Sequence, residues 1–201
     1  MKKETSMFLR QFLTSYSDDR LELLIETTER ALQGGIKCVQ FCWHSDCQEA
    51  EVIGLKVKAL VSSYGGVLVV NNFPRLASAL KADGLHIGQN DCSIEYARSV
   101  VGDDVVIGLT VNSISEMSGL ADYYGFGPVF RSRTKPVKVL GIQQLKKVCS
   151  VADKPVVAIG GITSGNMKDV FNAGACGIAF IGAIYDAEDK LQEARKLCST
   201  Y

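Results

Sequence analysis

The sequence has no excess of charge of either sign, because 22 lysine and arginine residues balance 22 aspartate and glutamate residues. This balance argues against a protein that binds nucleic acid through long-range electrostatics. Long hydrophobic runs are also missing. The longest uncharged runs, residues 59–74 and 170–185, are too short to cross a bilayer as helices and contain glycine and asparagine. We therefore expect neither nucleic acid nor a membrane as a partner.

No linker, low-complexity stretch or shift in composition divides the chain. A single domain spanning residues 1–201 is therefore expected. Lys2 and Lys3 do not introduce a signal peptide, because Arg10 interrupts the apolar segment that follows them. The seven cysteines include no CxxC pair, and without a secretion signal they indicate a reducing compartment. The expected location is cytoplasmic.

Short apolar runs alternate with helical patterns along the chain. The apolar runs are rich in Val, Ile and aromatic residues, as is typical of parallel strands buried on both faces. The expected strands are a weak one at Met7–Leu13, then Cys38–Trp43, Val67–Asn71, Gly84–Ile87, Val105–Val111, Tyr123–Phe130, Pro155–Ile159 and Gly177–Ile181. The expected helices include one from Asp18 or Asp19 to Gln33, then Glu49–Ser62, Pro74–Lys81, Ser93–Val101, Ser164–Ala173 with Ser164 as its cap, and Ala187–Leu197.

Eight strands, each followed by a helical or shortened crossover, predict an α/β fold, a single (β/α)8 TIM barrel. An open, doubly wound sheet is the main competitor, but no GxGxxG follows an early strand. In a barrel the functional residues are expected where each strand ends and its loop begins.

Glycines mark the ends of the last two expected strands, at Gly160-Gly161 and at Gly182. Glycines there expose backbone N–H groups that can bind an anion, and barrels often hold a substrate phosphate in this corner. The alternative is that these glycines only permit tight turns. Their occurrence on consecutive strands favours the phosphate site.

The segment after the sixth strand carries two hydroxyls and three cations in five positions, residues 131–135. Hydroxyls and cations bind phosphoryl groups, and a long loop suits a flap over an active site. The alternative is a solvated charged loop.

Oxygen-bearing side chains follow strands three and four, at Asn71-Asn72 and at Gln89-Asn90-Asp91. Amide and carboxylate oxygens on adjacent strand ends can ligate Mg²⁺, which usually shares such ligands with a phosphate. Turn formation and helix capping are the alternative roles of these residues.

Three segments, residues 82–91 (ADGLHIGQND), 122–130 (DYYGFGPVF) with Thr134-Lys135, and 158–162 (AIGGI), resemble the thiamine-phosphate synthase and TenI family in the order in which they occur. The resemblance covers nearly the whole chain after about residue 30. It implies a transferase that joins an aminopyrimidine-methyl diphosphate to a thiazole phosphate and releases diphosphate, with Mg²⁺ as the ion. Phosphorylated small molecules are the expected partners, and a homodimer is the assembly that the resemblance allows.

The resemblance also assigns residues to this reaction. Lys135 and Thr110 are the expected catalytic residues, with Thr110 in place of the usual serine. The residues expected to bind substrate are Gln40 for the pyrimidine, Asn71, Asn72 and Lys135 for the diphosphate, Ser132 and Thr134 for the thiazole, and Gly161, Ile181 and Gly182 for its phosphate. The expected magnesium ligands are Asp91 and, more weakly, Asn72. His86 is interpreted as a residue of the barrel interior.

The departures from the family pattern gather at the diphosphate corner. Cys42 and His44 stand where the family usually has Arg and Lys, and Asn72 stands where a metal-binding Asp is usual. Loss of two charged hydrogen bonds, at roughly 1.5–3 kcal/mol each, would slow the reaction about 10²- to 10⁴-fold. Arg131 and Arg133 could restore part of this charge.

Four other hypotheses remain open. A member that has lost the reaction would still bind thiazole phosphate or thiamine phosphate. A TenI-like tautomerase is disfavoured because Asn112 occupies the place of the expected histidine, and an amide cannot shuttle a proton. Cys42, His44 and Cys47 could bind zinc, or Cys42 could act as a nucleophile with His44, although unreactive thiols are the simpler interpretation.

Overall fold

The computed structural model describes residues 3–14, 21–132 and 138–199. Eight strands form a closed parallel barrel in which each strand pairs with the next and the last pairs with the first. This confirms the predicted (β/α)8 TIM barrel. The strands are β1 (Arg10–Leu13), β2 (Cys38–Phe41), β3 (Val67–Asn71), β4 (Gly84–Ile87), β5 (Val106–Val111), β6 (Tyr123–Phe126), β7 (Val156–Ile159) and β8 (Gly177–Phe180).

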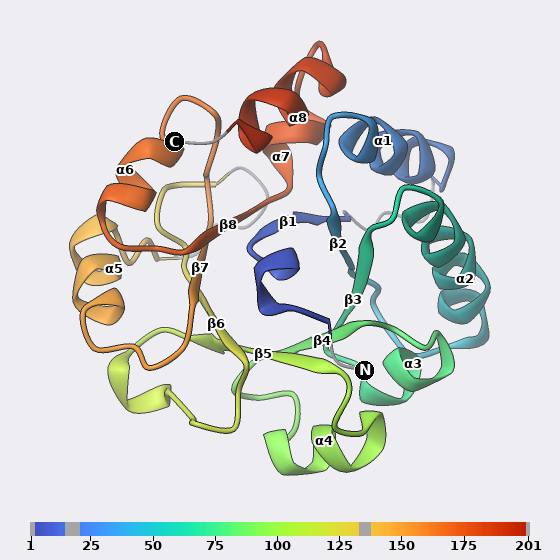
Figure 1. The fold of residues 1–201 in the computed structure, drawn as a ribbon, viewed down its shortest axis with the longest axis horizontal. Coiled ribbons are helices and arrows are strands. Elements are labelled where there is room, and N and C mark those ends of the chain that lie inside the picture. Colours follow the sequence, from blue (N-terminus) through green and yellow to red (C-terminus); the bar gives the residue numbers. More distant parts are fainter. Residues whose placement is uncertain (1–2, 15–20, 133–137, 200–201) are drawn as a thin grey trace.

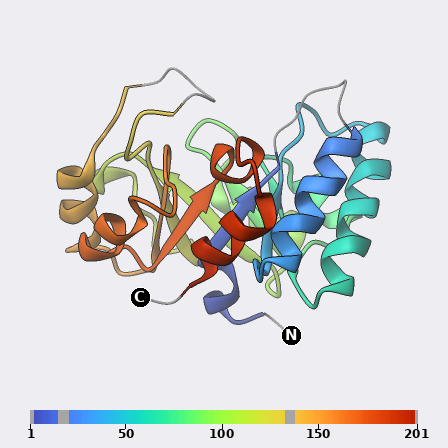
Figure 2. The ribbon, with the colours of Figure 1, turned by 90° about the horizontal axis from the view of Figure 1, so that it is seen from above.

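The helices surround the ring of strands, except for the first 3₁₀ helix, which lies in the middle of the ring (Figure 1). They are η1 (Thr5–Phe8), α1 (Leu21–Gln33), α2 (Gln48–Ser63), α3 (Pro74–Ala79), α4 (Ile94–Val101), η2 (Ile114–Glu116), α5 (Ile142–Cys149), α6 (Met167–Asn172), α7 (Gly182–Tyr185) and α8 (Lys190–Cys198). Seen from the side, the arrows of β1 and β8 point away from the edge where the N and C ends are marked (Figure 2).

The strands are apolar on both faces because each face packs against a different layer. In β3 the four residues Val67–Val70 are fully buried. Val67 and Val69 belong to the core inside the barrel together with Phe8 of η1, whereas Leu68 and Val70 belong to the core beneath the helices. This alternation follows from the two-residue period of a strand. Continuous apolar runs therefore predict the strands well.

The structure corrects the ends of several predicted elements. The sixth strand ends at Phe126 rather than Phe130, where Pro128 has no N–H to donate to the ladder. The next residues still bond the end of β7, since Val129 N donates to Ile159 O at 2.9 Å. The expected cap of the first long helix, Asp18 or Asp19, lies outside the described residues.

The last two crossovers also differ from the prediction. Helix α6 begins at Met167 after Asn166, so Ser164 is not its cap. The short helix α7 directly after β8 was not predicted, and α8 begins at Lys190 with Asp189 as its cap. The Asp189 side chain accepts a hydrogen bond from Gln192 N at 2.9 Å.

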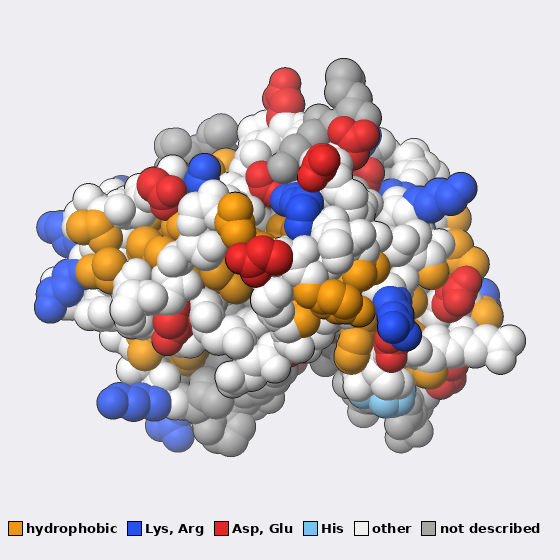
Figure 3. All heavy atoms as spheres, turned by 90° about the horizontal axis from the view of Figure 1, so that it is seen from below, with side chains coloured by type: hydrophobic (Ala, Val, Ile, Leu, Met, Phe, Trp, Pro, Cys, Tyr) orange, Lys and Arg blue, Asp and Glu red, His pale blue; other side chains and the backbone are white. Residues whose placement is uncertain are grey.

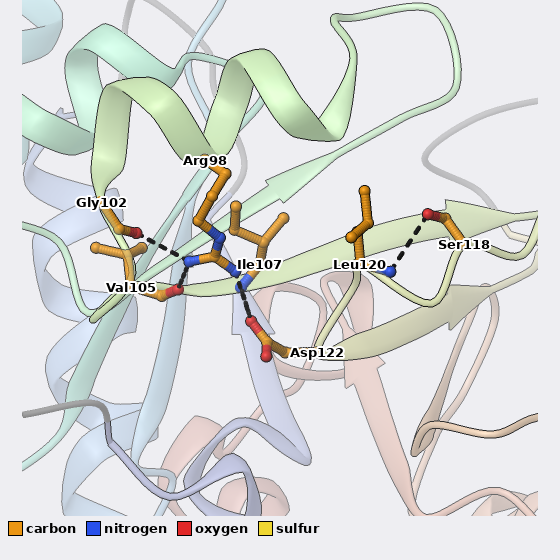
Figure 4. A network of polar contacts seen from close by, with 7 residues as sticks. All are labelled: Arg98, Gly102, Val105, Ile107, Ser118, Leu120 and Asp122. Carbon is orange, nitrogen blue, oxygen red and sulfur yellow. Dashed lines mark hydrogen bonds and ion pairs between the residues drawn. The ribbon is translucent and has the colours of Figure 1, made fainter.

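Arg98 and Asp122 join α4 to the starts of β5 and β6 (Figure 4). The Arg98 guanidinium donates to Asp122 Oδ2 at 3.0 Å and to the Gly102 carbonyl at 2.9 Å. Asp122 Oδ2 also accepts from Ile107 N at 2.8 Å. Both side chains are less than a quarter exposed. One carboxylate therefore holds a helix and a strand start together.

We expect Asp122→Ala to lower the free energy of unfolding by about 1–3 kcal/mol, because it leaves the Arg98 guanidinium and the Ile107 N–H without this acceptor. Asp103→Ala, in an exposed position of the preceding loop, removes the same charge and should change stability by less than about 0.5 kcal/mol. Urea unfolding of both variants checks this. Equal losses would mean that net charge, rather than the contact, stabilises this region.

None of the helices in the described part of the chain combines the length and the apolar composition of a membrane-spanning segment. On the face drawn in Figure 3, acidic side chains lie near one another at the top centre of the view around a basic one, and other basic side chains lie toward its left and right edges.

Candidate active site

A cavity of about 1380 Å³ opens where the strands end. Its lining includes every described residue to which the family resemblance assigns a role in the reaction: Gln40, Asn71, Asn72, Asp91, Thr110, Ser132, Gly161, Ile181 and Gly182. The two others, Thr134 and Lys135, lie outside the described residues. Residues from seven different loops and strand ends are thus brought to one place, as expected for a barrel.

The floor of the cavity contains polar side chains from β1 and β2. Gln11 and Gln40 are only 1 % and 3 % exposed. Gln40 Nε2 donates to Gln11 Oε1 at 2.8 Å, and Gln11 Nε2 donates to the Phe8 carbonyl at 2.7 Å. Sequence reasoning missed Gln11. Gln11 and Leu13 are two residues apart in one strand, so their side chains face the same side of it. This spacing is the sequence signal that could have identified Gln11.

A second set of polar side chains crosses β4, β5 and β6. His86 Nδ1 lies 3.1 Å from Tyr123 Oη, and His86 Nε2 lies 2.8 Å from Thr110 Oγ1. Burial lowers the pKa of His86 to about 4, so its imidazole is neutral near pH 7. Burial also raises the pKa of Tyr123 far above its usual range. His86 lies inside the barrel, as the sequence predicts.

Two glycines provide the space for these side chains. Gly108 of β5 pairs with His86 on one side and with Tyr123 on the other. A Cβ atom at Gly108 would lie 2.1 Å from Tyr123 Cζ, and one at Gly125 would lie 2.7 Å from His86 Cε1. Each position therefore has to be glycine for the two rings to meet inside the barrel.

The ends of β7 and β8 form the glycine corner. Gly161 has φ +62°, and a Cβ there would lie 2.5 Å from the Arg131 carbonyl oxygen. Asn166 Nδ2 donates to the Gly161 carbonyl at 2.9 Å and holds this turn. Gly161, Ile181 and Gly182 all line the cavity. The corner therefore places glycine backbone beside the cavity, which is the arrangement used in anion binding.

Asp91, Asn71 and Asn72 supply the oxygen atoms on the opposite side of the cavity. Asp91 Oδ2 accepts from Gly88 N at 2.6 Å, which holds the loop after β4. Asn72 has φ +71°, and its N–H donates to the His86 carbonyl at 2.7 Å. One carboxylate with neighbouring amides is too few ligands for an all-protein site. It fits Mg²⁺ that takes further oxygens from a bound phosphate.

The zinc hypothesis is contradicted by the structure. Among the described residues, no three His, Cys, Asp or Glu side chains are grouped so that they could hold a metal ion. Cys42 and His44 line the cavity, whereas Cys47 precedes α2 as its N-cap residue. Hydrogen bonds, chiefly from the Ser45 side chain, lower the pKa of the Cys47 thiol.

Among the described residues, the charged side chains that line the cavity are mostly acidic. In the described part of the chain the lining cations are Arg131 and Lys196, whereas the lining carboxylates are Asp91, Asp186, Glu188, Asp189 and Glu193. Lys196 is itself 3.6 Å from Glu193. The acidic residues near α7 and α8 were not predicted from the sequence, because an unpredicted helix brings them to the mouth.

Asn112 is placed away from this lining. Its backbone N–H and its side-chain amide both bond Glu116 Oε2, at 2.7 and 3.2 Å. It is exposed, and it is not among the described residues that line the cavity. The position at which a tautomerase would need its histidine therefore carries an amide with a structural partner.

Comparison with known proteins relates this chain to thiamine-phosphate synthases. A family model described as thiamine monophosphate synthase matches residues 11–184. Thiamine-phosphate synthase of Limosilactobacillus reuteri is 33 % identical over 88 % of this chain and 87 % of its own length. Thiamine-phosphate synthase 1 of Aquifex aeolicus is 36 % identical over 89 % of this chain and 86 % of its own.

Solved structures give the same relationship. A thiamine phosphate pyrophosphorylase from Pyrococcus furiosus superposes with a TM-score of 0.83 and 31 % identity, covering 96 % of both chains. A 3-hexulose-6-phosphate synthase has a TM-score of 0.73 at 14 % identity and covers 94 % of this chain and 97 % of its own, a likeness of fold alone.

Proposed function

Because this chain belongs to the thiamine monophosphate synthase family, we propose that it joins hydroxymethylpyrimidine diphosphate to thiazole phosphate in thiamine biosynthesis. The C–O bond to diphosphate breaks, and diphosphate leaves with the bonding electrons. The thiazole nitrogen then donates its lone pair to the pyrimidine methylene cation and forms the new C–N bond. The observation that carries the proposal is that the described residues expected to act in this reaction all line one cavity.

The proposed roles are those that the family resemblance assigns. Gln40 meets the pyrimidine on the floor, and Thr110 stands beside it. Asn71 and Lys135 bind the diphosphate, and Ser132 and Thr134 meet the thiazole. Gly161, Ile181 and Gly182 hold the thiazole phosphate through exposed backbone N–H groups. Lys135 and Arg131 supply positive charge as the diphosphate leaves.

Asp91 and Asn72 are the proposed magnesium ligands, since carboxylate and amide oxygens suit this ion. When bound with diphosphate, Mg²⁺ would neutralise charge that develops on the leaving group. Gly88 N bonds Asp91 Oδ2 and so holds that carboxylate toward the site.

A turnover assay tests the proposal. Purified protein is given the pyrimidine diphosphate, thiazole phosphate and Mg²⁺, and thiamine phosphate is measured. We expect turnover of about 0.1–10 per second, at the low end of the ordinary range of enzymes or just below it. Folded protein that makes no product above background would refute the synthase proposal.

The altered lining supports one alternative, a family member that binds thiazole phosphate or thiamine phosphate without turnover. Cys42 and His44 line the cavity where cations are usual, and carboxylates outnumber cations in the described lining. Calorimetry separates the two proposals. A binding protein would bind thiazole phosphate and show no heat with the pyrimidine diphosphate and Mg²⁺.

Arg131→Ala should lower turnover about 10-fold, because a charged hydrogen bond to a phosphoryl group contributes at least roughly 1.5 kcal/mol. Arg131 lines the cavity, whereas Arg75 is exposed on α3 and does not. Arg75→Ala is therefore the matched control and should leave turnover unchanged. The same result with both variants would show that Arg131 does not replace the missing cations.

The proposed setting is cytoplasmic, with phosphorylated small molecules as partners and a homodimer as the assembly. Seven free thiols support a reducing compartment. Sedimentation equilibrium tests the dimer.

A further inference from the structure

The row of Tyr123, His86 and Thr110 connects the barrel interior to the cavity wall. Tyr123 is fully buried, and Thr110 lines the cavity. The rings of His86 and Tyr123 lie 5.6 Å apart, with the imidazole between the phenol and the Thr110 hydroxyl. A neutral imidazole carries one N–H and one lone pair. The direction in which it donates therefore decides what the Thr110 hydroxyl can do.

The direction follows from the hydrogen of the Tyr123 hydroxyl. Tyr123 is fully buried, so this hydrogen has to meet an acceptor. Gln11 presents its amide nitrogen to the Phe8 carbonyl at 2.7 Å and its oxygen to Gln40 Nε2 at 2.8 Å. His86 Nδ1 lies 3.1 Å from Tyr123 Oη, and its lone pair is the acceptor that the phenol meets there.

We propose that Tyr123 and His86 are positioning residues that turn the hydrogen of the Thr110 hydroxyl into the cavity. Tyr123 donates to His86 Nδ1 and holds the imidazole as its Nε2–H tautomer. His86 Nε2–H then donates to Thr110 Oγ1. With one lone pair of Thr110 occupied in this way, its O–H points toward the ligand.

The consequence concerns the ligand atom that meets Thr110. That atom has to be a hydrogen-bond acceptor, such as a ring nitrogen without hydrogen or a phosphoryl oxygen. A donor at this point would face the Thr110 hydrogen. In the proposed function Thr110 touches the ligand, whereas His86 and Tyr123 act through it. This contact and the kinetic consequence rest on the proposed synthase function, whereas the tautomer does not.

Nitrogen NMR tests the tautomer directly. The chain has two histidines, so histidine labelled with ¹⁵N gives two imidazoles, and His44→Gln assigns them. We expect His86 at pH 7 to be protonated on Nε2 and unprotonated on Nδ1. Tyr123→Phe removes the donor to Nδ1 and should populate the Nδ1–H form. Thr110→Val leaves that donor in place and should keep the Nε2–H form.

The Nδ1–H tautomer in the unsubstituted protein would overturn the proposal, and this spectrum needs no variant to fold. An unchanged tautomer in folded Tyr123→Phe would overturn it as well.

A double-mutant cycle on turnover gives the second readout. With the pyrimidine diphosphate, thiazole phosphate and Mg²⁺ as substrates, Tyr123→Phe should slow turnover about 2- to 12-fold, the equivalent of one neutral hydrogen bond. In the Thr110→Val background it should have no further effect, because the residue on which it acts is gone. The same loss in both backgrounds would show a merely structural role and refute the proposal. Absence of synthase turnover would refute the proposed function, while the NMR result would still decide the tautomer.

Discussion

Phe8→Ala is expected to lower the free energy of unfolding by about 3–5 kcal/mol, the usual cost of removing a fully buried phenylalanine. Phe8 ends η1 in the middle of the barrel and is 0 % exposed. It packs so closely that a Cβ at Gly84 would lie 2.8 Å from Phe8 Cε1. The closed ring of strands leaves little freedom to collapse into the space that alanine would create.

Urea unfolding followed by circular dichroism measures this loss. Leu120→Ala is the control, because Leu120 is a large apolar residue that is 56 % exposed. It should change stability by less than about 0.5 kcal/mol. A loss below about 1 kcal/mol for Phe8→Ala would mean that this side chain does not close the barrel floor.

Asp91→Asn is expected to lower turnover at least about 100-fold and to raise the Mg²⁺ concentration needed for half-maximal rate. Loss of a residue that only supports a metal ligand costs about 10- to 100-fold, so loss of the charged ligand itself should reach the upper end or exceed it. The asparagine oxygen can still accept from Gly88 N, so the loop after β4 keeps the hydrogen bond it now has at 2.6 Å. The variant therefore tests charge and not folding.

Asp103→Asn, at an exposed position outside the cavity lining, is the control for the loss of one charge. It should leave the magnesium titration unchanged. If Asp91→Asn gave the same titration as the unsubstituted protein, Asp91 would not be a magnesium ligand.

The sequence predicts the barrel because its strands satisfy a simple rule. Val67–Asn71 and Gly84–Ile87 are predicted residue for residue, since strands packed on both faces are apolar throughout. Helix α7 is not predicted, because its four residues are too few to show a helical period and Ile181 before it makes no side-chain cap hydrogen bond. Ser164 fails as a cap because Asn166, two residues later, precedes the helix. Both errors concern where a short helix begins, which a few residues decide.

The cavity lining is predicted where it follows strand ends, as at Asn71 and Gly161. The contacts among interior side chains are not, because they join residues far apart in the sequence. Gln11 meets Gln40 across 29 positions, and His86 meets Tyr123 across 37. Whether such pairs form depends on the register of neighbouring strands and on the space left at Gly108 and Gly125. Neither follows from the residue types alone.

The separation between an uncharged floor and a charged rim has a consequence for redesign. In the described part of the chain, the floor is built from amides, hydroxyls and a neutral imidazole carried by rigid strands, and the charges that line the cavity stand in loops and outer helices. With the roles proposed above, ring recognition would fall to the floor and leaving-group chemistry to the rim. Exchanging the loops after β2 and β6 should then change which leaving group is accepted, while the proposed pyrimidine subsite is kept and the barrel needs no repacking.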